Sequence, residues 1–371
     1  MELNSKNITV IGVGRLGLGL ALLLEKGGYN ICGVDIFQEY VNQLNNKDYK
    51  TNEPEYENLL KESNNFHSTT SLDEGLNFSD IIFIIVQTPN CGGNRFYDHT
   101  ILSNLLLKIN KKKVVNKNLI IGCTVMPKYI DEIGKMLISD CKNTTLNYNP
   151  EFVAQGEIVK GFYNPDIILI GTESQELGSK LKEVYSSFVK TTPVYCILRP
   201  LEAEIVKISI NGFITTKLSF ANMISDLCDN VGANKEDVLR SIGGDSRIGN
   251  KYFRPGYSFG GPCFPRDTKA LKQVLDQNNI NSELLKSTTL MNELHSEFQA
   301  NQLLKTNKDE YVIEDICYKE NSVVPIIEES AKLKIAEQLI KKGKKVIIKD
   351  VPHMIDEVKK EYGILFDYET K

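Results

Sequence analysis

One cysteine stands in a setting that could serve covalent chemistry. Cys263 lies in "YSFGGPCFPRDTKAL", between a Gly-Gly pair and a Pro-Arg-Asp exit that leads into an apolar-periodic run. The start of a helix, with an arginine nearby, favours the thiolate form of a cysteine. Glycines and proline beside a thiol open the backbone to a ligand, so we interpret Cys263 as a nucleophile. We expect Asp267 and Thr268 to cap the helix that follows, and the other cysteines to be small core residues.

Two further polar residues have spacing that could serve the same chemistry. Lys207 and Asn211 are four residues apart in a helical pattern, so they share one face. Two donors side by side can hold a substrate oxygen that becomes negative. Taken alone, the pair fits a solvated helix face somewhat better.

A nucleotide site is predicted near the start of the chain. In "ITVIGVGRLGLGLALLLEKGGYNICGVDI", an apolar strand enters Gly12-x-Gly14-x-x-Gly17, a Leu/Ala-rich helix follows, and a second strand closes on Asp35. The glycines permit a tight turn, close approach of the backbone to a pyrophosphate and close helix-on-strand packing. A carboxylate about 20 residues further on accepts hydrogen bonds from a ribose hydroxyl and repels a 2′-phosphate. The pattern therefore predicts NAD as cofactor, not NADP.

Short β-branched runs continue this unit. They are "DIIFIIVQTP", "NLIIGCTV", "TLNYNPEF" and "PDIILIG", each bounded by Gly, Pro or Asn. Near-continuous apolar runs are typical of a parallel sheet covered by helices on both faces. Val86, Thr88, Pro89 and Thr124 lie at the C-terminal ends of their strands, where an open α/β sheet has its ligand crevice.

The second half of the chain begins with one long predicted helix. It runs from Pro200 to Gly232, about 30 residues or roughly 45 Å, a length typical of helices that bridge domains or form subunit interfaces. Later, "EYVIEDICYKENS" and "KKVIIKD" indicate two strands flanking the helix "ESAKLKIAEQLIKKG", which suggests a second, incomplete α/β unit. The fold class is thus α/β. The predicted domains are a Rossmann-like domain (1–197), a central helical and dimerisation domain (198–298) and a smaller, incomplete C-terminal α/β domain (299–371).

Composition excludes several function classes. A net charge of −4 gives no basic field for nucleic acid, and 41% hydrophobic residues suffice for a large core. No signal peptide or membrane-length apolar run is evident, so we expect no membrane partner and a cytoplasmic location. Eight scattered cysteines and four histidines indicate reduced thiols and no metal site.

The motifs together resemble a known family. GVGRLG, VQTP, CTV, YNPEFVAQG, AEIVKISINGF, DSRIGNKYFRPG and FGGPCFPRD follow, in order, those of the UDP-glucose/GDP-mannose 6-dehydrogenase family over roughly residues 7–350. "RIGNKYF", then PG, then FGGPC are most similar to the UDP-glucose 6-dehydrogenase branch. "RPGYSFGGPCFPRDTKAL" is also similar to GDP-mannose dehydrogenases.

The resemblance implies a four-electron oxidation of a nucleotide-sugar C6 alcohol by two NAD+ in sequence, in a homodimer or higher homo-oligomer. Cys263 would form a thiohemiacetal and then a thioester, which water releases as the uronate. The implied catalytic residues are Cys263, Lys207, Asn211, Glu151, Asp267 and Thr124. The implied cofactor-binding residues are Gly12, Gly14, Gly17, Asp35, Val86, Thr88, Pro89, Thr124 and Arg266. The implied substrate-binding residues are Glu151, Phe152, Lys207, Asn211, Arg247, Tyr257, Phe259, Gly260 and Lys319, with Arg247 reaching the neighbouring subunit's substrate.

The chain also departs from the family pattern. Arg15-Leu16 replaces the usual Tyr-Val, and Gln155 stands where Glu is usual. "DICYKENSVVPIIEES" keeps Lys319 but loses the aspartates and arginine of a TDDxRxS motif, and no arginine follows Arg266. In the family, C-terminal arginines touch cofactor and substrate diphosphate. We therefore expect these arginines to have no counterpart here and the final strands of that domain to be missing. Three readings stay open: an active dehydrogenase of UDP-glucose, GDP-mannose or a UDP-N-acetylhexosamine, a catalytically weak binding paralogue, and a two-electron dehydrogenase of a small hydroxy acid.

Overall fold

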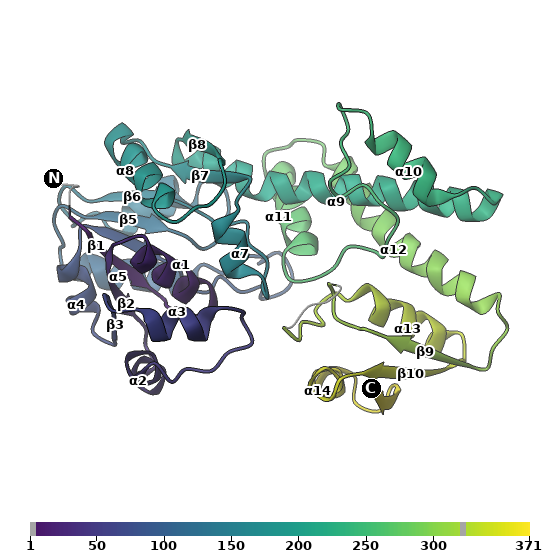
Figure 1. Ribbon diagram of the computed structural model, residues 1–371. Coiled ribbons are helices and arrows are strands. Elements are labelled where there is room, and N and C mark those ends of the chain that lie inside the picture. Colours follow the sequence, from purple (N-terminus) through teal and green to yellow (C-terminus); the bar gives the residue numbers. More distant parts are fainter. Residues whose placement is uncertain (1–4, 320–323) are drawn as a thin grey trace. The chain divides into compact units, whose positions relative to one another are not determined.

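The computed structural model describes residues 5–319 and 324–371, and the chain divides into two compact units, Met1–Lys207 and Ile208–Lys371 (Figure 1). The α/β class expected from the sequence is confirmed. No helix in the described parts of the chain is long and apolar enough to cross a bilayer.

The first unit is built on an eight-stranded sheet in the order β3-β2-β1-β4-β5-β6-β7-β8. Its strands are β1 (Asn7–Ile11), β2 (Asn30–Val34), β3 (Phe66–Thr69), β4 (Ile81–Ile84), β5 (Asn118–Ile121), β6 (Thr145–Tyr148), β7 (Ile167–Gly171) and β8 (Val194–Leu198). The expected parallel sheet is confirmed except between β6 and β7, which pair antiparallel through Tyr148 and Gly171. The short strand β3 and the partly exposed strand β8 were not predicted.

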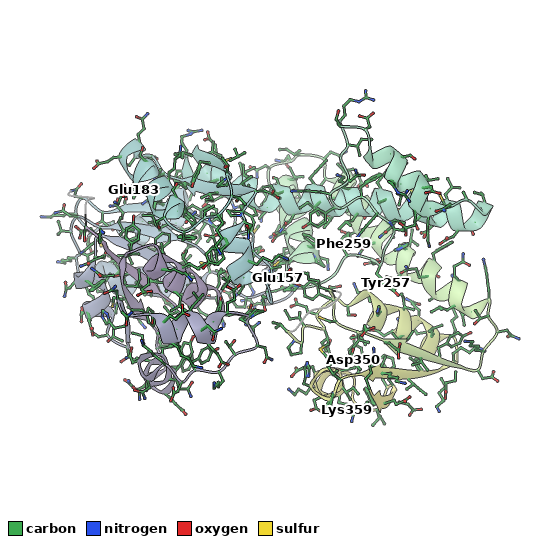
Figure 2. The ribbon with its side chains drawn as sticks, in the orientation of Figure 1. Glu157, Glu183, Tyr257, Phe259, Asp350 and Lys359 are labelled. Atoms are coloured by element: carbon green, nitrogen blue, oxygen red, sulfur yellow. The ribbon has the colours of Figure 1, made fainter. Side chains whose placement is uncertain are left out.

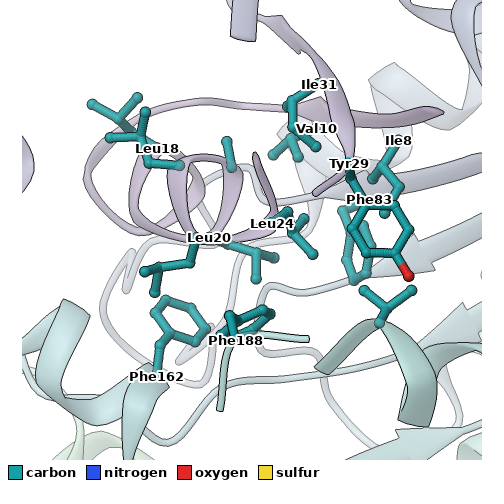
Figure 3. Packing of buried hydrophobic residues seen from close by; sticks show 14 of the residues in the cluster. Ile8, Val10, Leu18, Leu20, Leu24, Tyr29, Ile31, Phe83, Phe162 and Phe188 are labelled. Atoms are coloured by element: carbon teal, nitrogen blue, oxygen red, sulfur yellow. The ribbon is translucent and has the colours of Figure 1, made fainter. Parts of the chain in front are cut away.

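Helices cover both faces of this sheet. They are α1 (Arg15–Lys26), α2 (Gln38–Asn46), α3 (Tyr56–Glu62), α4 (Leu72–Phe78), α5 (Thr100–Lys111), η1 (Tyr129–Gly134), α6 (Lys135–Leu137), α7 (Ile158–Tyr163) and α8 (Gln175–Ser186). Successive strand residues alternate between two buried clusters, as the period of two requires. One cluster packs the strands against α1, α7 and α8 (Figure 3), and the other packs them against α4 and α5.

Helix α9 (Pro200–Val231) confirms the predicted long helix. Its proline occupies the first helical position, and Gly232 follows its last residue with φ +77°, a left-handed conformation that favours glycine. The second unit continues with α10 (Lys235–Gly243), α11 (Phe264–Gln277) and α12 (Glu283–Leu304).

The start of α11 corrects one expectation. The N-cap is Cys263 itself, without a side-chain cap hydrogen bond, and the Asp267 main-chain N–H donates to the Cys263 carbonyl at 2.8 Å. Asp267 and Thr268 therefore lie in the first turns of the helix, and the prediction that they cap it was wrong. The helix begins at Phe264, earlier than a cap at Asp267 and Thr268 would place it. Pro265 fits this earlier start, because a proline in the first turn of a helix loses no hydrogen bond through its missing N–H.

A three-stranded parallel sheet, ordered β11-β10-β9, ends the chain. Strands β9 (Glu310–Glu314) and β10 (Lys345–Asp350) flank α13 (Ala331–Lys341), as expected. The structure adds α14 (Pro352–Tyr362) and β11 (Asp367–Thr370), so this unit has a third strand that the sequence analysis did not predict.

Candidate active site

The glycine-rich turn joins β1 to α1 in a form suited to a diphosphate. Gly12 has φ +88°, and a Cβ there would lie 2.3 Å from the Ile85 carbonyl oxygen. A Cβ on Gly17 would lie 1.9 Å from the Gly12 carbonyl oxygen, so only glycine lets the helix approach the turn this closely. A Cβ on Gly14 would meet nothing within 4 Å, which leaves open space at the helix start. These residues fit a dinucleotide whose phosphates are held by backbone N–H groups.

Asp35 directly follows β2. Its Oδ1 accepts hydrogen bonds from the N–H groups of Ile36 at 2.8 Å and Phe37 at 3.4 Å. The Asp35 N–H in turn donates to the Thr69 carbonyl at 3.1 Å, which ties the turn to β3. These bonds fix the carboxylate just past the end of β2, where the motif requires an acceptor for a ribose hydroxyl.

The predicted residues after β4 and β5 do follow the C-terminal ends of these strands, and a hydrogen bond links the two segments. Thr88, which is buried, donates from Oγ1 to the Thr124 carbonyl at 3.0 Å. The Pro89 carbonyl accepts from the Asp98 N–H at 2.9 Å, and Val86 packs against the buried cluster behind the sheet. The segments after the two strands are thus joined at the same edge of the sheet.

Glu151 is the strongest acid–base candidate of this unit. Burial raises its pKa to about 7, although the Tyr185 hydrogen bond and the positive charge of Lys207 both act to lower it. The Tyr185 hydroxyl contacts both Glu151 Oε1 and, at 2.6 Å, Asn149 Oδ1. A hydroxyl has one proton and can donate to only one of them at a time, so a proton on Glu151 completes the network. The carboxyl group is therefore poised to exchange a proton near neutral pH.

Lys207 is held beside the same loop. Its Nζ donates to the Glu151 carbonyl oxygen at 2.7 Å and lies 4.3 Å from the centroid of the Phe152 ring. The side chain is only 7% exposed. A buried ammonium group with one carbonyl acceptor and an aromatic face is positioned to attract a developing negative charge.

The second unit carries a buried polar link between α9 and α11. Asn211 Nδ2 donates to Asp267 Oδ2 at 2.5 Å, and the Thr215 and Thr268 hydroxyls lie 2.8 Å apart one turn further on. The two helices approach closely because position 212 is glycine, where a Cβ would lie 2.8 Å from Leu271. Asp267 thereby fixes the amide of Asn211.

Cys263 presents an exposed thiol at the start of α11. The two preceding glycines pack closely against other segments of the same unit. A Cβ on Gly260 would lie 2.1 Å from the Glu329 carbonyl oxygen, and a Cβ on Gly261, at φ +78°, would lie 2.3 Å from the Tyr318 ring. Glycine at both positions thus allows close packing within the second unit, and the expectation that these glycines also open the backbone to a ligand stays a prediction.

The remaining predicted binding residues belong to the second unit. Phe259 is buried, and both its N–H and its carbonyl are bound by Asn292 at 2.7 and 2.9 Å. Tyr257 is exposed, with Lys332 Nζ 5.1 Å from its ring centroid (Figure 2).

Arg247 is 86% exposed at its side chain and pairs with Asp245 at 2.6 Å. The structure places Arg266 in the first turn of α11 and Lys319 after β9. Their roles stay predictions.

Sequence reasoning missed Tyr185 and Asn149. Asn149 lies inside the quoted "YNPEF" segment, which was a usable signal. Tyr185 lies 34 residues after Glu151 on α8, at a position that is typical of an ordinary helix core residue.

Among the described residues, Cys32, His67 and Glu74 bring possible metal-ligand atoms within 4.8 Å of one another. Burial, reinforced by the charge of Glu74, raises the pKa of the Cys32 thiol to about 12, which favours the thiol over the thiolate that binds metal.

Family models match most of the chain. The model described as "UDP-glucose/GDP-mannose dehydrogenase family, NAD binding domain" matches residues 6–189, and that of the central domain matches residues 201–294. The chain belongs to this family. The family consists of NAD-dependent nucleotide-sugar 6-dehydrogenases. The predicted family and the predicted cofactor, NAD, are therefore both confirmed.

Relatives and solved structures agree. The chain is 30% identical over 294 residues to a UDP-glucose 6-dehydrogenase of Rickettsia prowazekii, covering 78% of this chain and 67% of the relative. It is 31% identical over 296 residues to one of Bacillus subtilis, covering 77% of this chain and 66% of the relative. A UDP-glucose dehydrogenase structure from Pyrobaculum islandicum superposes with a TM-score of 0.88 at 24% identity, over 99% of this chain and 86% of the other. A GDP-mannose dehydrogenase structure from Pseudomonas aeruginosa gives a TM-score of 0.60 at 26% identity, over 96% and 84%. The chain thus spans about two thirds of the length of the curated relatives it matches.

Proposed function

We propose that the protein oxidises the C6 alcohol of a nucleotide sugar to the carboxylate with two NAD+, and that UDP-glucose is its substrate, UDP-glucuronate its product. The observation that carries the proposal is a hydrogen-bond chain in the second unit. Asn211 donates to Asp267, whose N–H donates to the carbonyl of Cys263. Asn211 can donate to an oxyanion, and the Cys263 thiol can act as the nucleophile. Both residues are hydrogen-bonded to the buried Asp267.

The reaction proceeds in four steps. The C6 alcohol loses a hydride, passes its hydroxyl proton to solvent through Glu151, and becomes an aldehyde. The Cys263 thiolate adds to the aldehyde carbon, and the oxygen of this thiohemiacetal is stabilised by Lys207 and Asn211. Loss of a second hydride gives a thioester. Water, deprotonated with the help of Glu151 and oriented by Thr124, then releases the carboxylate and the thiol. Bound NAD accepts the hydride in each oxidation.

This assignment keeps the three-part division at 1–197, 198–298 and 299–371, with substrate contacts from Phe152, Tyr257, Phe259, Gly260 and Lys319. The choice of UDP-glucose rests on its curated relatives, named UDP-glucose 6-dehydrogenases. GDP-mannose is the second candidate, because a solved GDP-mannose dehydrogenase aligns with 96% of this chain.

A catalytically weak binding paralogue is favoured by one feature, the lack of any arginine after Arg266. The test is a screen of the purified protein for NADH release with UDP-glucose, GDP-mannose and UDP-N-acetylhexosamines. The proposal expects the largest kcat/KM with UDP-glucose. Larger values with another sugar nucleotide would replace the substrate, and binding of sugar nucleotides without NADH release would favour the paralogue.

A further inference from the structure

The glycine-rich turn of this chain carries a cation. Arg15, the first residue of α1, lies between Gly14 and Gly17, and its side chain is 48% exposed. Arginine is positively charged at all physiological pH values and offers five N–H donors in a planar fork. The Arg15 guanidinium is therefore next to the predicted phosphate site, and its position depends on the residues that bind it.

Two residues from other segments hold the guanidinium. Arg15 Nη1 donates to Gln155 Oε1, and Arg15 Nε lies 3.8 Å from Glu53 Oε1. Two of the positions at which this sequence departs from the family pattern, 15 and 155, are therefore in direct contact. The half-buried amide of Gln155 is neutral, so it orients the guanidinium without cancelling its charge.

Glu53 is the anchor of this arrangement. Its side chain is 1% exposed, and both carboxylate oxygens accept from the Gly156 N–H, at 2.9 and 3.0 Å. Because Gly156 already binds this carboxylate and Arg15 stands 3.8 Å away, Glu53 positions the arginine without a close bidentate ion pair. The Tyr56 hydroxyl fixes the other end of the residue by donating to the Arg15 carbonyl at 2.7 Å.

In its first turn, α1 adds no further carboxylate beside this cation. Its first turn contains no acidic residue, and its N-cap, Gly14, has no side chain. A dinucleotide's diphosphate carries two negative charges, against the single charge of a Glu53 carboxylate that is already hydrogen-bonded. Charge-assisted hydrogen bonds from a guanidinium to phosphate are among the strongest of the polar contacts in proteins.

We propose that Arg15 is a cofactor-binding residue whose guanidinium, positioned by Glu53 and Gln155, binds the diphosphate of the dinucleotide. This extends the NAD-binding role of the domain to a side chain, whereas the glycine motif supplies only backbone groups. It also gives this chain a cation for the diphosphate within the first unit, in a sequence with no arginine after Arg266.

The test measures binding without turnover. The chain has no tryptophan, so isothermal titration calorimetry is preferable to tryptophan quenching, with ADP-ribose as the diphosphate ligand and adenosine as the phosphate-free ligand. Arg15→Ala should weaken ADP-ribose binding by roughly 10-fold or more, the loss of one charge-assisted hydrogen bond, and adenosine binding by less than about twofold. Arg15→Lys should recover part of the loss, and Gln155→Ala should lose a smaller part.

The matched control is Lys160→Ala, which removes an exposed cation from neighbouring α7. It should leave both ligands unchanged. Raising the salt concentration should weaken ADP-ribose binding less in Arg15→Ala than in the unmodified protein, because one charge contact is gone.

Equal losses for ADP-ribose and adenosine in Arg15→Ala would show that Arg15 only supports the fold, and no loss for either would overturn the proposal as well. Circular dichroism melting separates a folded variant from a misfolded one, and Arg15→Lys serves if Arg15→Ala does not fold. The proposal rests on NAD binding by the domain and not on sugar oxidation. If NADH release fails in the substrate screen while ADP-ribose binding depends on Arg15, only the proposed function is lost.

Discussion

At the scale of single residues, Glu151 combines burial with a nearby cation. Burial raises its pKa to about 7 while Lys207 and Tyr185 hold it below the value that burial alone would give. A group with this pKa is half ionised at neutral pH, so it can both accept and return a proton within one catalytic cycle. Its support comes from a network of three side chains on different elements, Tyr185, Asn149 and Lys207.

This account predicts a pH-dependent activity that Glu151 controls. The base must be ionised to accept a proton, so kcat should rise with pH through about 7 and level off above it. Glu151→Gln should lose this rise and lower kcat by roughly 10²- to 10⁴-fold. Steady-state rates between pH 5.5 and 9 measure both effects. Glu157→Gln, which changes an exposed carboxylate paired with Lys160, should keep the normal profile, and an unaltered rise in Glu151→Gln would exclude Glu151 as the base.

Asp35 should control the choice between NAD and NADP. Its carboxylate is fixed by two backbone N–H groups just beyond β2, where it would repel a 2′-phosphate. Asp35→Ala should weaken NAD binding and lower the preference for NAD over NADP by about tenfold. Titration calorimetry with both cofactors provides the ratio. If the unmodified protein binds NAD and NADP equally, Asp35 has no such role.

At the scale of elements, α9 carries a row of exposed apolar side chains. Phe213, Phe220, Leu227 and Val231 are 71%, 47%, 55% and 67% exposed. At 100° per residue they fall within about 40° of one another around the helix. A contiguous apolar face on a long helix is typical of a protein–protein interface. We infer that this face is covered by a second copy of the chain.

The corresponding prediction concerns assembly. The double variant Phe220→Glu with Leu227→Glu should shift the protein from a dimer or higher oligomer to a monomer, because two charges per subunit would be buried without partners. Light scattering at micromolar concentration measures the mass. The control Ile364→Glu changes a fully exposed apolar residue elsewhere in the same unit and should leave the mass unchanged. A monomeric unmodified protein would contradict the inference.

The elements also show what the sequence could and could not predict. The βαβ unit and α9 were predictable, because glycine, proline and apolar periodicity act locally. The antiparallel pairing of β7 was not, since strand direction depends on contacts between distant segments. The same limit applies to the site. Glu151 and Cys263 stand in recognisable motifs, whereas Tyr185 and the packing of Tyr318 against Gly261 depend on tertiary contacts that leave no local pattern.

At the scale of the whole molecule, the question is whether the polar network around Asn211 and Asp267 serves a full four-electron oxidation in a chain that spans about two thirds of its relatives' length. A two-electron hydroxy-acid dehydrogenase would need the NAD domain and a long helix but no thiol. The proposed four-electron mechanism uses Cys263 in the second oxidation, where a hydride leaves the covalent adduct to give the thioester.

The most direct test is the number of NADH released per sugar nucleotide consumed, measured with limiting UDP-glucose and excess NAD. The account predicts two NADH per sugar and a uronate product by mass spectrometry. It also predicts that Cys263→Ser forms no uronate at an appreciable rate while binding NAD normally, and that Cys91→Ser, at another exposed cysteine, still releases two. One NADH per sugar from the unmodified protein, or uronate formation by Cys263→Ser at the unmodified rate, would contradict the thioester mechanism.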